Sequence, residues 1–220
     1  MVAFHFLWDL SYFRWLHLAM HRDAPWIHWR TAIVTQFLLL VGVGLMLRTE
    51  FKPARADFWK RWRQAAAAAA LVSVGSALLF GSRFIYFGVL HFVAIALLLT
   101  SPLLRLGPWL IALGLGAVTL GLTFQHEFFT PPGWNVLGFA LEKPRTEDYV
   151  PLFPWIGVVW IGAGLAAWWR MHGWRMAGPL AQINAHPPRV LRFLGVWPLT
   201  VYLLHQPLLM AGLWLVRTFF

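Results

Sequence analysis

The sequence predicts an all-α integral membrane protein, a polytopic bundle of about seven transmembrane helices. Three observations lead to this fold class. Hydrophobic residues make up 60% of the 220 residues and charged residues only 12%, whereas a soluble domain carries roughly 25% charged residues. The apolar residues fall into long runs, and a membrane-spanning helix needs about 20 of them. No stretch alternates with period two over about ten residues, which disfavours a transmembrane β-barrel.

The first three predicted helices lie at residues 1–20, 29–47 and 65–81. The first is apolar from Val2 and lacks the basic flank of a signal peptide, so we expect it to be a helix that lacks its beginning. The second is mostly apolar. The third begins with a run of alanines, residues 65–70, and a face of small residues allows another helix to pack closely.

The last four predicted helices lie at residues 84–100, 107–124, 151–169 and 193–216. Small residues recur at helical spacing in the second of these, in the pairs Ala112/Gly116 and Ala117/Gly121. Gly162-Ala-Gly164 has the spacing of a dinucleotide-binding loop, but no strand precedes it, and we interpret it as helix packing. Since backbone groups in lipid must bond internally, helices explain all seven segments. We expect residues 1–220 to form one membrane domain.

Charge sets the expected topology. Six Lys and Arg residues gather between residues 48 and 64, and basic loops face the cytoplasm. Residues 125–150 then form a long loop on the outer side. The chain should be a multi-pass protein of the cell's inner (plasma) membrane, with the lipid bilayer as a partner. We attribute the net charge of +10 to this topology and to anionic headgroups, and expect no nucleic-acid partner.

Ionisable side chains inside a membrane are costly and are therefore candidates for function. His5 and Asp9 are spaced i and i+4 in the first predicted helix, so they share a face. A carboxylate beside an imidazole fixes its tautomer and raises its basicity, as a general base requires. The alternative is a hydrogen-bonded pair that packs helices.

Three further positions carry polar groups of interest. His91 and the pair His205-Gln206 lie at similar depths in the fourth and seventh predicted helices, so the three histidines can meet in one bundle. Arg145 in the outer loop can hold an anionic or sugar substrate, or form an ion pair with Glu147 or Asp148. The chain has no Cys, which excludes thiol nucleophiles and Cys-ligated metals.

Four stretches of the chain, in order, resemble bacterial members of the heparan-α-glucosaminide N-acetyltransferase catalytic-domain family. They are residues 1–10, 84–96, 144–157 and 202–208. The resemblance implies a membrane acyltransferase that moves an acetyl group from cytoplasmic acetyl-CoA to an extracytoplasmic amino sugar or glycan. The family normally has an Asp and an Arg-Gly pair upstream of the first stretch, and this sequence does not contain them.

The resemblance also implies site residues. A His late in the first helix is essential in related acyltransferases, and His5, with Asp9, matches that place. In the eukaryotic enzyme the catalytic His lies nearer the first luminal loop, where His21 is the candidate, so His5 and His21 compete. Under the acyltransferase hypothesis, the candidate substrate-binding residues are His91, Arg145, His205 and Gln206. The cations Arg55, Lys60, Arg61 and Arg63 either hold the phosphates of coenzyme A or only set the topology.

Two other interpretations stay open at this point. The chain can be a non-enzymatic transporter or assembly subunit whose buried His and Asp residues line a path. It can also be a b-type haem protein with two of His5, His91 and His205 as axial ligands. The acyltransferase is the favoured interpretation, in which acetyl-CoA is a substrate and no metal or haem is expected. A homodimer is one oligomeric state that we consider.

Overall fold

The long apolar runs of the sequence form helices. A computed structural model describes residues 1–20, 22–50, 55–173 and 188–219. Over these residues the structure is helical, apart from loops and one isolated bridge between Phe87 and Tyr149. Within the same ranges, five helical stretches are long and apolar enough to cross a membrane. The all-α, polytopic fold class is therefore confirmed, while the number of about seven helices stays a prediction.

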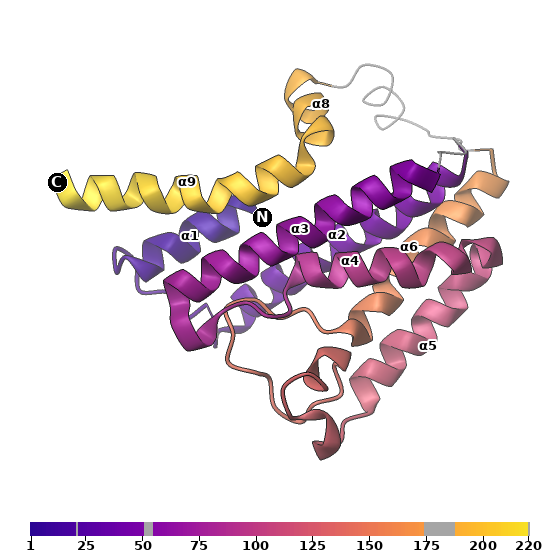
Figure 1. Ribbon diagram of the computed structural model, residues 1–220, viewed down its shortest axis with the longest axis horizontal. Coiled ribbons are helices and arrows are strands. Elements are labelled where there is room, and N and C mark those ends of the chain that lie inside the picture. Colours follow the sequence, from indigo (N-terminus) through magenta and orange to yellow (C-terminus); the bar gives the residue numbers. More distant parts are fainter. Residues whose placement is uncertain (21, 51–54, 174–187, 220) are drawn as a thin grey trace. The chain divides into compact units, whose positions relative to one another are not determined.

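Contacts along the chain divide it into two compact units (Figure 1). Met1–Val34 and Arg175–Phe220 make up the first unit, and Thr35–Trp174 the second. Helix α2 runs from the first unit into the second without a break. The α-helices are α1 (Val2–Tyr12), α2 (Ala24–Glu50), α3 (Arg55–Phe80), α4 (Val89–Thr100), α5 (Leu110–Thr123), α6 (Leu152–Met171), α8 (Arg189–Val196) and α9 (Pro198–Phe219).

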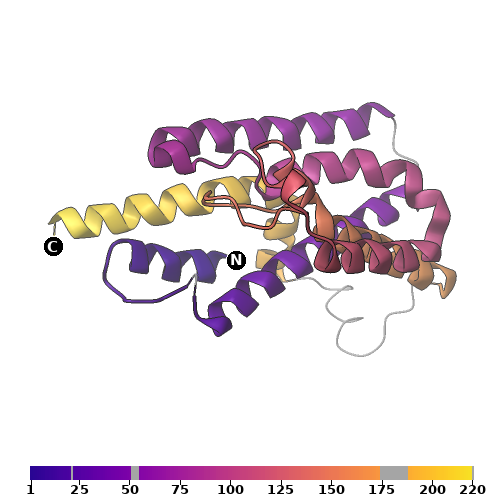
Figure 2. The ribbon, with the colours of Figure 1, turned by 90° about the horizontal axis from the view of Figure 1, so that it is seen from below.

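In the first unit, α1 and α9 lie side by side, as both ribbon views show (Figures 1 and 2). Phe4 of α1 is buried and meets the ring of Trp29 edge-on at 5.5 Å between centroids. Phe13, just past α1, is also buried, and the guanidinium of Arg217 lies 5.9 Å from its ring. The first contact joins α1 to α2, and the second joins the end of α1 to α9.

Helix α1 is shorter than the predicted segment 1–20. It ends at Tyr12, and Arg14 follows with a positive φ of 64°. The backbone N–H groups of Trp15 and Leu16 both donate to the carbonyl of Leu10, which closes the last turn and directs the chain away from the helix axis. The apolar composition continues past this point, but the helix does not.

The start of α3 and the course of the last predicted segment also differ from the prediction. Residues 55–64, which we assigned to the basic loop 48–64, form the start of α3. The reason is local: Arg, Ala, Lys and Gln favour helix, and Asp57 lies in the first turn, where the helix dipole favours an acid. The last predicted segment, 193–216, is divided at Trp197 into α8 and α9. Pro198 then begins α9, where its missing N–H is tolerated.

The second unit is built around the contact of α5 with α6. Gly114 of α5 lies so close to Gly157 of α6 that a methyl group on either would overlap backbone atoms of the other helix. Gly121 approaches the backbone of Pro154 in the same way, and Ala117 between these glycines is buried. Glycines here replace side-chain interdigitation with direct backbone contact.

The same packing confirms our interpretation of Gly162-Ala-Gly164. Gly162 lies against the backbone of Leu39 in α2, and Gly164 against Ile111 in α5. In contrast, the predicted pair Ala112/Gly116 is exposed, and Gly116 has open space where a side chain would project. The core beside these contacts contains Met46, Leu110, Ala163, Ala166 and Ala167.

Helices α4 and α5 belong to one continuous apolar stretch, but the chain turns between them (Figure 1). The turn is the 3₁₀-helix η2 (Ser101–Trp109), in which Gly107 adopts a φ of +56°, a conformation that glycine adopts without steric cost. The two predicted helices at 84–100 and 107–124 thus correspond to α4 and α5.

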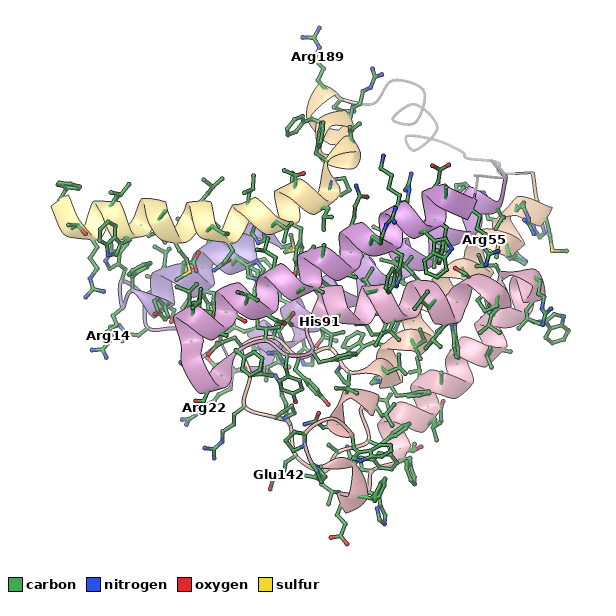
Figure 3. All side chains as sticks on the ribbon, in the orientation of Figure 1. Arg14, Arg22, Arg55, His91, Glu142 and Arg189 are labelled. Atoms are coloured by element: carbon green, nitrogen blue, oxygen red, sulfur yellow. The ribbon has the colours of Figure 1, made fainter. Side chains whose placement is uncertain are left out.

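The predicted outer loop, residues 125–150, contains no long helix. Between α5 and α6 the chain forms only the short 3₁₀-helices η3 (Glu127–Phe129) and η4 (Asn135–Leu137). Its interior is aromatic, since Phe139 lies within 5.3 Å, between ring centroids, of Phe124, Phe129 and Phe153. Charged residues such as Glu142 point outward (Figure 3).

Candidate functional site

Two histidines, 200 residues apart in sequence, touch in the first unit. Nδ1 of His5, in α1, lies 2.7 Å from Nε2 of His205, in α9. The ring centroids are 4.9 Å apart and the ring planes differ by 26°. His205 is only 9% exposed. Water therefore competes little for this hydrogen bond, which is stronger in such surroundings than at a surface.

The other ring nitrogen of His205 turns back on its own helix. Nδ1 lies 2.7 Å from the carbonyl oxygen of Tyr202 and 3.1 Å from that of Val201. These contacts limit the rotation of the ring about its side-chain bonds. His205 is therefore held between its own helix on one side and His5 on the other.

The next residue along α9 makes the second polar contact. The side-chain amide Nε2 of Gln206 donates to Oδ1 of Asp9 over 2.6 Å. Asp9 is 0% exposed, and its second oxygen, Oδ2, is buried without a hydrogen-bond partner in the described part of the chain. The same holds for Oε1 of Gln206. An unpaired buried carboxylate oxygen is energetically unfavourable, and such groups gather at functional sites.

These contacts revise the expected pairing within the site. The i, i+4 spacing of His5 and Asp9 predicted that the carboxylate would orient the imidazole directly. The two residues do share the face that meets α9, but α9 supplies each with its own partner, and no hydrogen bond joins Asp9 to His5 over the residues described. The pattern is two parallel contacts, His5 with His205 and Asp9 with Gln206.

His91 belongs to the second unit (Figure 3). The N–H of Gly88 donates to its Nδ1 over 3.3 Å, and its Nε2 lies 2.9 Å from Oγ of Ser73 in α3. Since Ser73 donates its own proton to the carbonyl of Ile85, His91 donates from Nε2. Nε2 thus links α4 to α3, while Nδ1 caps the start of α4 itself. Its role in substrate binding stays a prediction.

Polar contacts join the end of the outer loop to the segment before α4 and to the first residue of α4. Arg83 and Glu147 form an ion pair of 3.2 Å, and the N–H of Val89, at the start of α4, donates to Oδ2 of Asp148 over 2.9 Å. Arg145 itself is exposed. The alternative that we gave for Arg145, an ion pair with Glu147, thus has a competitor in Arg83.

Tyr149, at the end of this loop, and Tyr86, in the segment before α4, are a pair of neighbouring tyrosines. The hydroxyl of Tyr149 donates to the carbonyl of Asn135 over 2.6 Å. Burial, and secondarily the charge of a nearby Tyr86, raises the pKa of Tyr149 to about 12. Burial also raises the pKa of Tyr86. Both hydroxyls therefore remain protonated and available as donors at physiological pH.

The predicted phosphate-binding cations belong to α3. Arg55, Lys60, Arg61 and Arg63 are exposed on the first turns of α3, in the second unit. His21 lies outside the described residues. No group of three or more His, Cys, Asp or Glu side chains is arranged to hold a metal ion in the described ranges.

Sequence reasoning found the four residues of the α1–α9 contact but missed what surrounds them. The backbone carbonyls of Val201 and Tyr202 leave no mark in a sequence. Ser73 and Ser76 are the two polar residues in an otherwise apolar stretch of α3, residues 65–80, and that isolation is the signal that could have identified Ser73 as the partner of a buried group.

Comparison with models of protein families identifies the family of this chain. The family model described as heparan-alpha-glucosaminide N-acetyltransferase, catalytic, matches residues 1–207. The chain belongs to this family, and its membership points to membrane acetyltransferase activity. No curated protein sequence and no solved structure matches the chain. The matched range includes all four residues of the α1–α9 contact.

Proposed function

We propose that this protein transfers an acetyl group from cytoplasmic acetyl-CoA to an amino sugar or glycan on the opposite side of the membrane. The observation that carries the proposal is the buried polar contact between α1 and α9, within a chain of an acetyltransferase family. The proposed location is the inner membrane, which the chain crosses several times.

In this proposal His5 is the general base. It takes the proton of the acceptor's amine or hydroxyl as that group attacks the acetyl carbonyl. A carbon–nitrogen or carbon–oxygen bond forms, the carbon–sulfur bond of the thioester breaks, and coenzyme A leaves as the thiolate. A positioned base contributes about 10²- to 10⁴-fold to such a step. Asp9, one turn along the same face, favours the positive charge that His5 gains.

The donor side of the proposal rests on α3. Arg55, Lys60, Arg61 and Arg63 are exposed near the start of that helix, where the predicted topology puts the cytoplasm. Cationic side chains bind phosphate oxygens by charge-assisted hydrogen bonds, so these residues are proposed to hold the phosphates of coenzyme A. On the outer side, Arg145 is exposed and is proposed to contact the glycan.

The test is transfer by the full chain reconstituted in lipid vesicles. Radiolabelled acetyl-CoA is supplied on the side of the membrane that bears the basic start of α3, and glucosamine is supplied on the other side. We expect label on the amino sugar and loss of thioester. His5→Gln should lower the turnover number by on the order of 10²-fold or more. His28→Gln is the matched control, since His28 is exposed on α2 in the same unit.

The other outcomes are equally informative. If His21→Gln abolishes transfer while His5→Gln does not, the base is His21. Stable label on the protein, removed by adding acceptor, would mean that a His carries the acetyl group in a two-step reaction. If solute crosses the vesicles without any thioester loss, the proposal is wrong and the transporter interpretation takes its place.

A further inference from the structure

The hydrogen bonds of His205 determine where its proton lies. Its Nδ1 faces two carbonyl oxygens, of Tyr202 at 2.7 Å and of Val201 at 3.1 Å. A carbonyl oxygen only accepts hydrogen bonds, and one nitrogen of a neutral imidazole donates while the other accepts. The proton of neutral His205 is therefore on Nδ1, and its Nε2 carries a lone pair.

That assignment fixes the proton of His5 in turn. Nδ1 of His5 lies 2.7 Å from Nε2 of His205. Two lone pairs at this distance repel each other, so Nδ1 of His5 must carry the proton and donate it. The remaining nitrogen of His5, Nε2, is then left with its lone pair and without a hydrogen-bond partner among the residues described.

We propose that His205 is a positioning residue, which holds His5 in the tautomer whose Nε2 is free to act as a base and which then shares the proton that His5 receives. This inference rests on the proposed function for its catalytic part. In this inference His205 acts on His5, whereas the sequence analysis predicted that His205 binds the substrate. The chain of donors runs from Nδ1 of His5 to His205, and from Nδ1 of His205 to the carbonyl of Tyr202.

The proton balance of the step is simple. The acceptor's N–H or O–H bond breaks, and an N–H bond forms at Nε2 of His5. The proton already on Nδ1 of His5 can then cross the 2.7 Å to Nε2 of His205. His5 becomes neutral again, now protonated on Nε2, and His205 carries the positive charge. The departing thiolate is protonated when the pair returns to its starting state.

The surroundings of the pair favour a positive charge during the reaction. Asp9 is fully buried, and its Oδ2 has no hydrogen-bond partner over the described residues. A buried carboxylate without a full set of partners is unfavourable in a low-dielectric interior. A proton gained by the histidine pair, one helical turn away, reduces that cost. The contact of Asp9 with Gln206 also fixes α1 relative to α9 and thereby the spacing of the two rings.

The test separates the tautomer from the activity. The full chain is labelled with ¹⁵N in its histidine rings and placed in lipid nanodiscs, and nuclear magnetic resonance reports which nitrogen of each ring carries a proton. The chain has nine histidines, so His5→Gln identifies the signals of His5. Two variants are compared. His205→Gln retains a side-chain oxygen that can accept from His5, and His205→Phe retains a ring of similar size without an acceptor.

In the native chain we expect His5 to be protonated on Nδ1. His205→Gln should keep this tautomer but lower the turnover number by on the order of 10²-fold, since an amide does not take up the proton. His205→Phe should give both tautomers of His5 and a larger loss, with KM for acetyl-CoA little changed in either variant. His28→Phe, at an exposed position of the same unit, controls for labelling and reconstitution.

Three results would overturn the inference. The first is a native His5 protonated on Nε2. The second is a His5 tautomer that His205→Phe leaves unchanged. The third is a variant of His205 that raises KM and leaves the turnover number as it was, which would make His205 a substrate contact. The expected tautomers without transfer by any form would support the tautomer assignment and overturn the proposed function.

Discussion

The contact of α1 with α9 and the contact of α5 with α6 each pack two helices against one another, but they use different residues to do so. Helices α5 and α6 approach through glycines, and their contact relies on shape alone. Helices α1 and α9 instead place four polar side chains in their contact, with a carboxylate oxygen left unpaired. Polar groups buried at such a cost need a reason beyond packing, because the α5–α6 contact holds together without them.

The largest expected effect is at the glycine contact. Gly114→Leu would force a side chain into the backbone of Gly157, and we expect the free energy of unfolding to fall by about 3 kcal/mol. Gly116→Leu is the matched control, two residues along the same helix, where open space surrounds the position. Denaturant titration of the detergent-solubilised chain, followed by helical circular dichroism, measures both.

Equal losses in the two leucine variants would contradict this account of the α5–α6 contact. They would mean that replacing any glycine of α5 by leucine lowers the free energy of unfolding, whether or not the backbone of α6 lies against it.

Substitutions in the polar contact of α1 with α9 should have a different effect, because one of them is expected to raise stability and lower activity. Asp9→Asn keeps an oxygen that accepts from Gln206 and adds an N–H group that can donate to the unpaired Oε1 of Gln206. We expect the free energy of unfolding to rise by about 1 kcal/mol, while acetyl transfer falls because the charge beside His5 is lost. The same denaturant titration and the vesicle assay measure the two quantities.

Asp9→Leu is the contrasting variant. It leaves the amide of Gln206 buried without its acceptor, and the expected loss is about 1–3 kcal/mol. If Asp9→Asn destabilised the chain as much as Asp9→Leu does, the carboxylate would be a structural group, and the difference between the two helix contacts would disappear.

A smaller effect is expected where the outer loop meets α4. Asp148→Ala removes the acceptor of the Val89 N–H at the start of that helix, and loss of such a contact costs about 1 kcal/mol. Glu142→Ala, at an exposed position of the same loop, is expected to change the thermal midpoint of unfolding very little. Equal midpoint shifts would show that general loop charge, and not this contact, stabilises the junction.

The smallest effect is expected at the ion pair of Arg83 with Glu147. The Arg83 side chain is 62% exposed and that of Glu147 17% exposed, so Arg83→Gln should cost about 0.5 kcal/mol. Because salt screens exposed charges, the difference between variant and native chain should shrink further as ionic strength rises. A difference that salt leaves unchanged would indicate that the guanidinium acts through hydrogen bonds.

These regions also differ in how well the sequence predicts them. Hydropathy identified the apolar helices, since spans depend on length and composition. It missed the end of α1 at Tyr12, because the residues that follow are as apolar as the helix. It also missed the start of α3 at Arg55, where helix-forming residues continue into a charged stretch.

For the site, spacing predicted that His5 and Asp9 share a face but could not supply their partners. A period of 3.6 residues says which side chains point the same way, and it says nothing about which helix they meet. The partners His205 and Gln206 lie about 200 residues further along the chain. Whether they pair with His5 and Asp9 depends on how α9 lies against α1, and this arrangement is seen only in the folded structure.

The glycine contact of α5 with α6 has a consequence for genetics. Glycine is the smallest residue, so every missense change at Gly114 or Gly157 enlarges a position that faces backbone. If the proposed function holds, a screen that scores only acetyl transfer would recover such changes alongside those at His5, although the first class removes the folded protein and the second removes the proposed general base. Measuring the amount of protein in the membrane for each mutant separates the two classes.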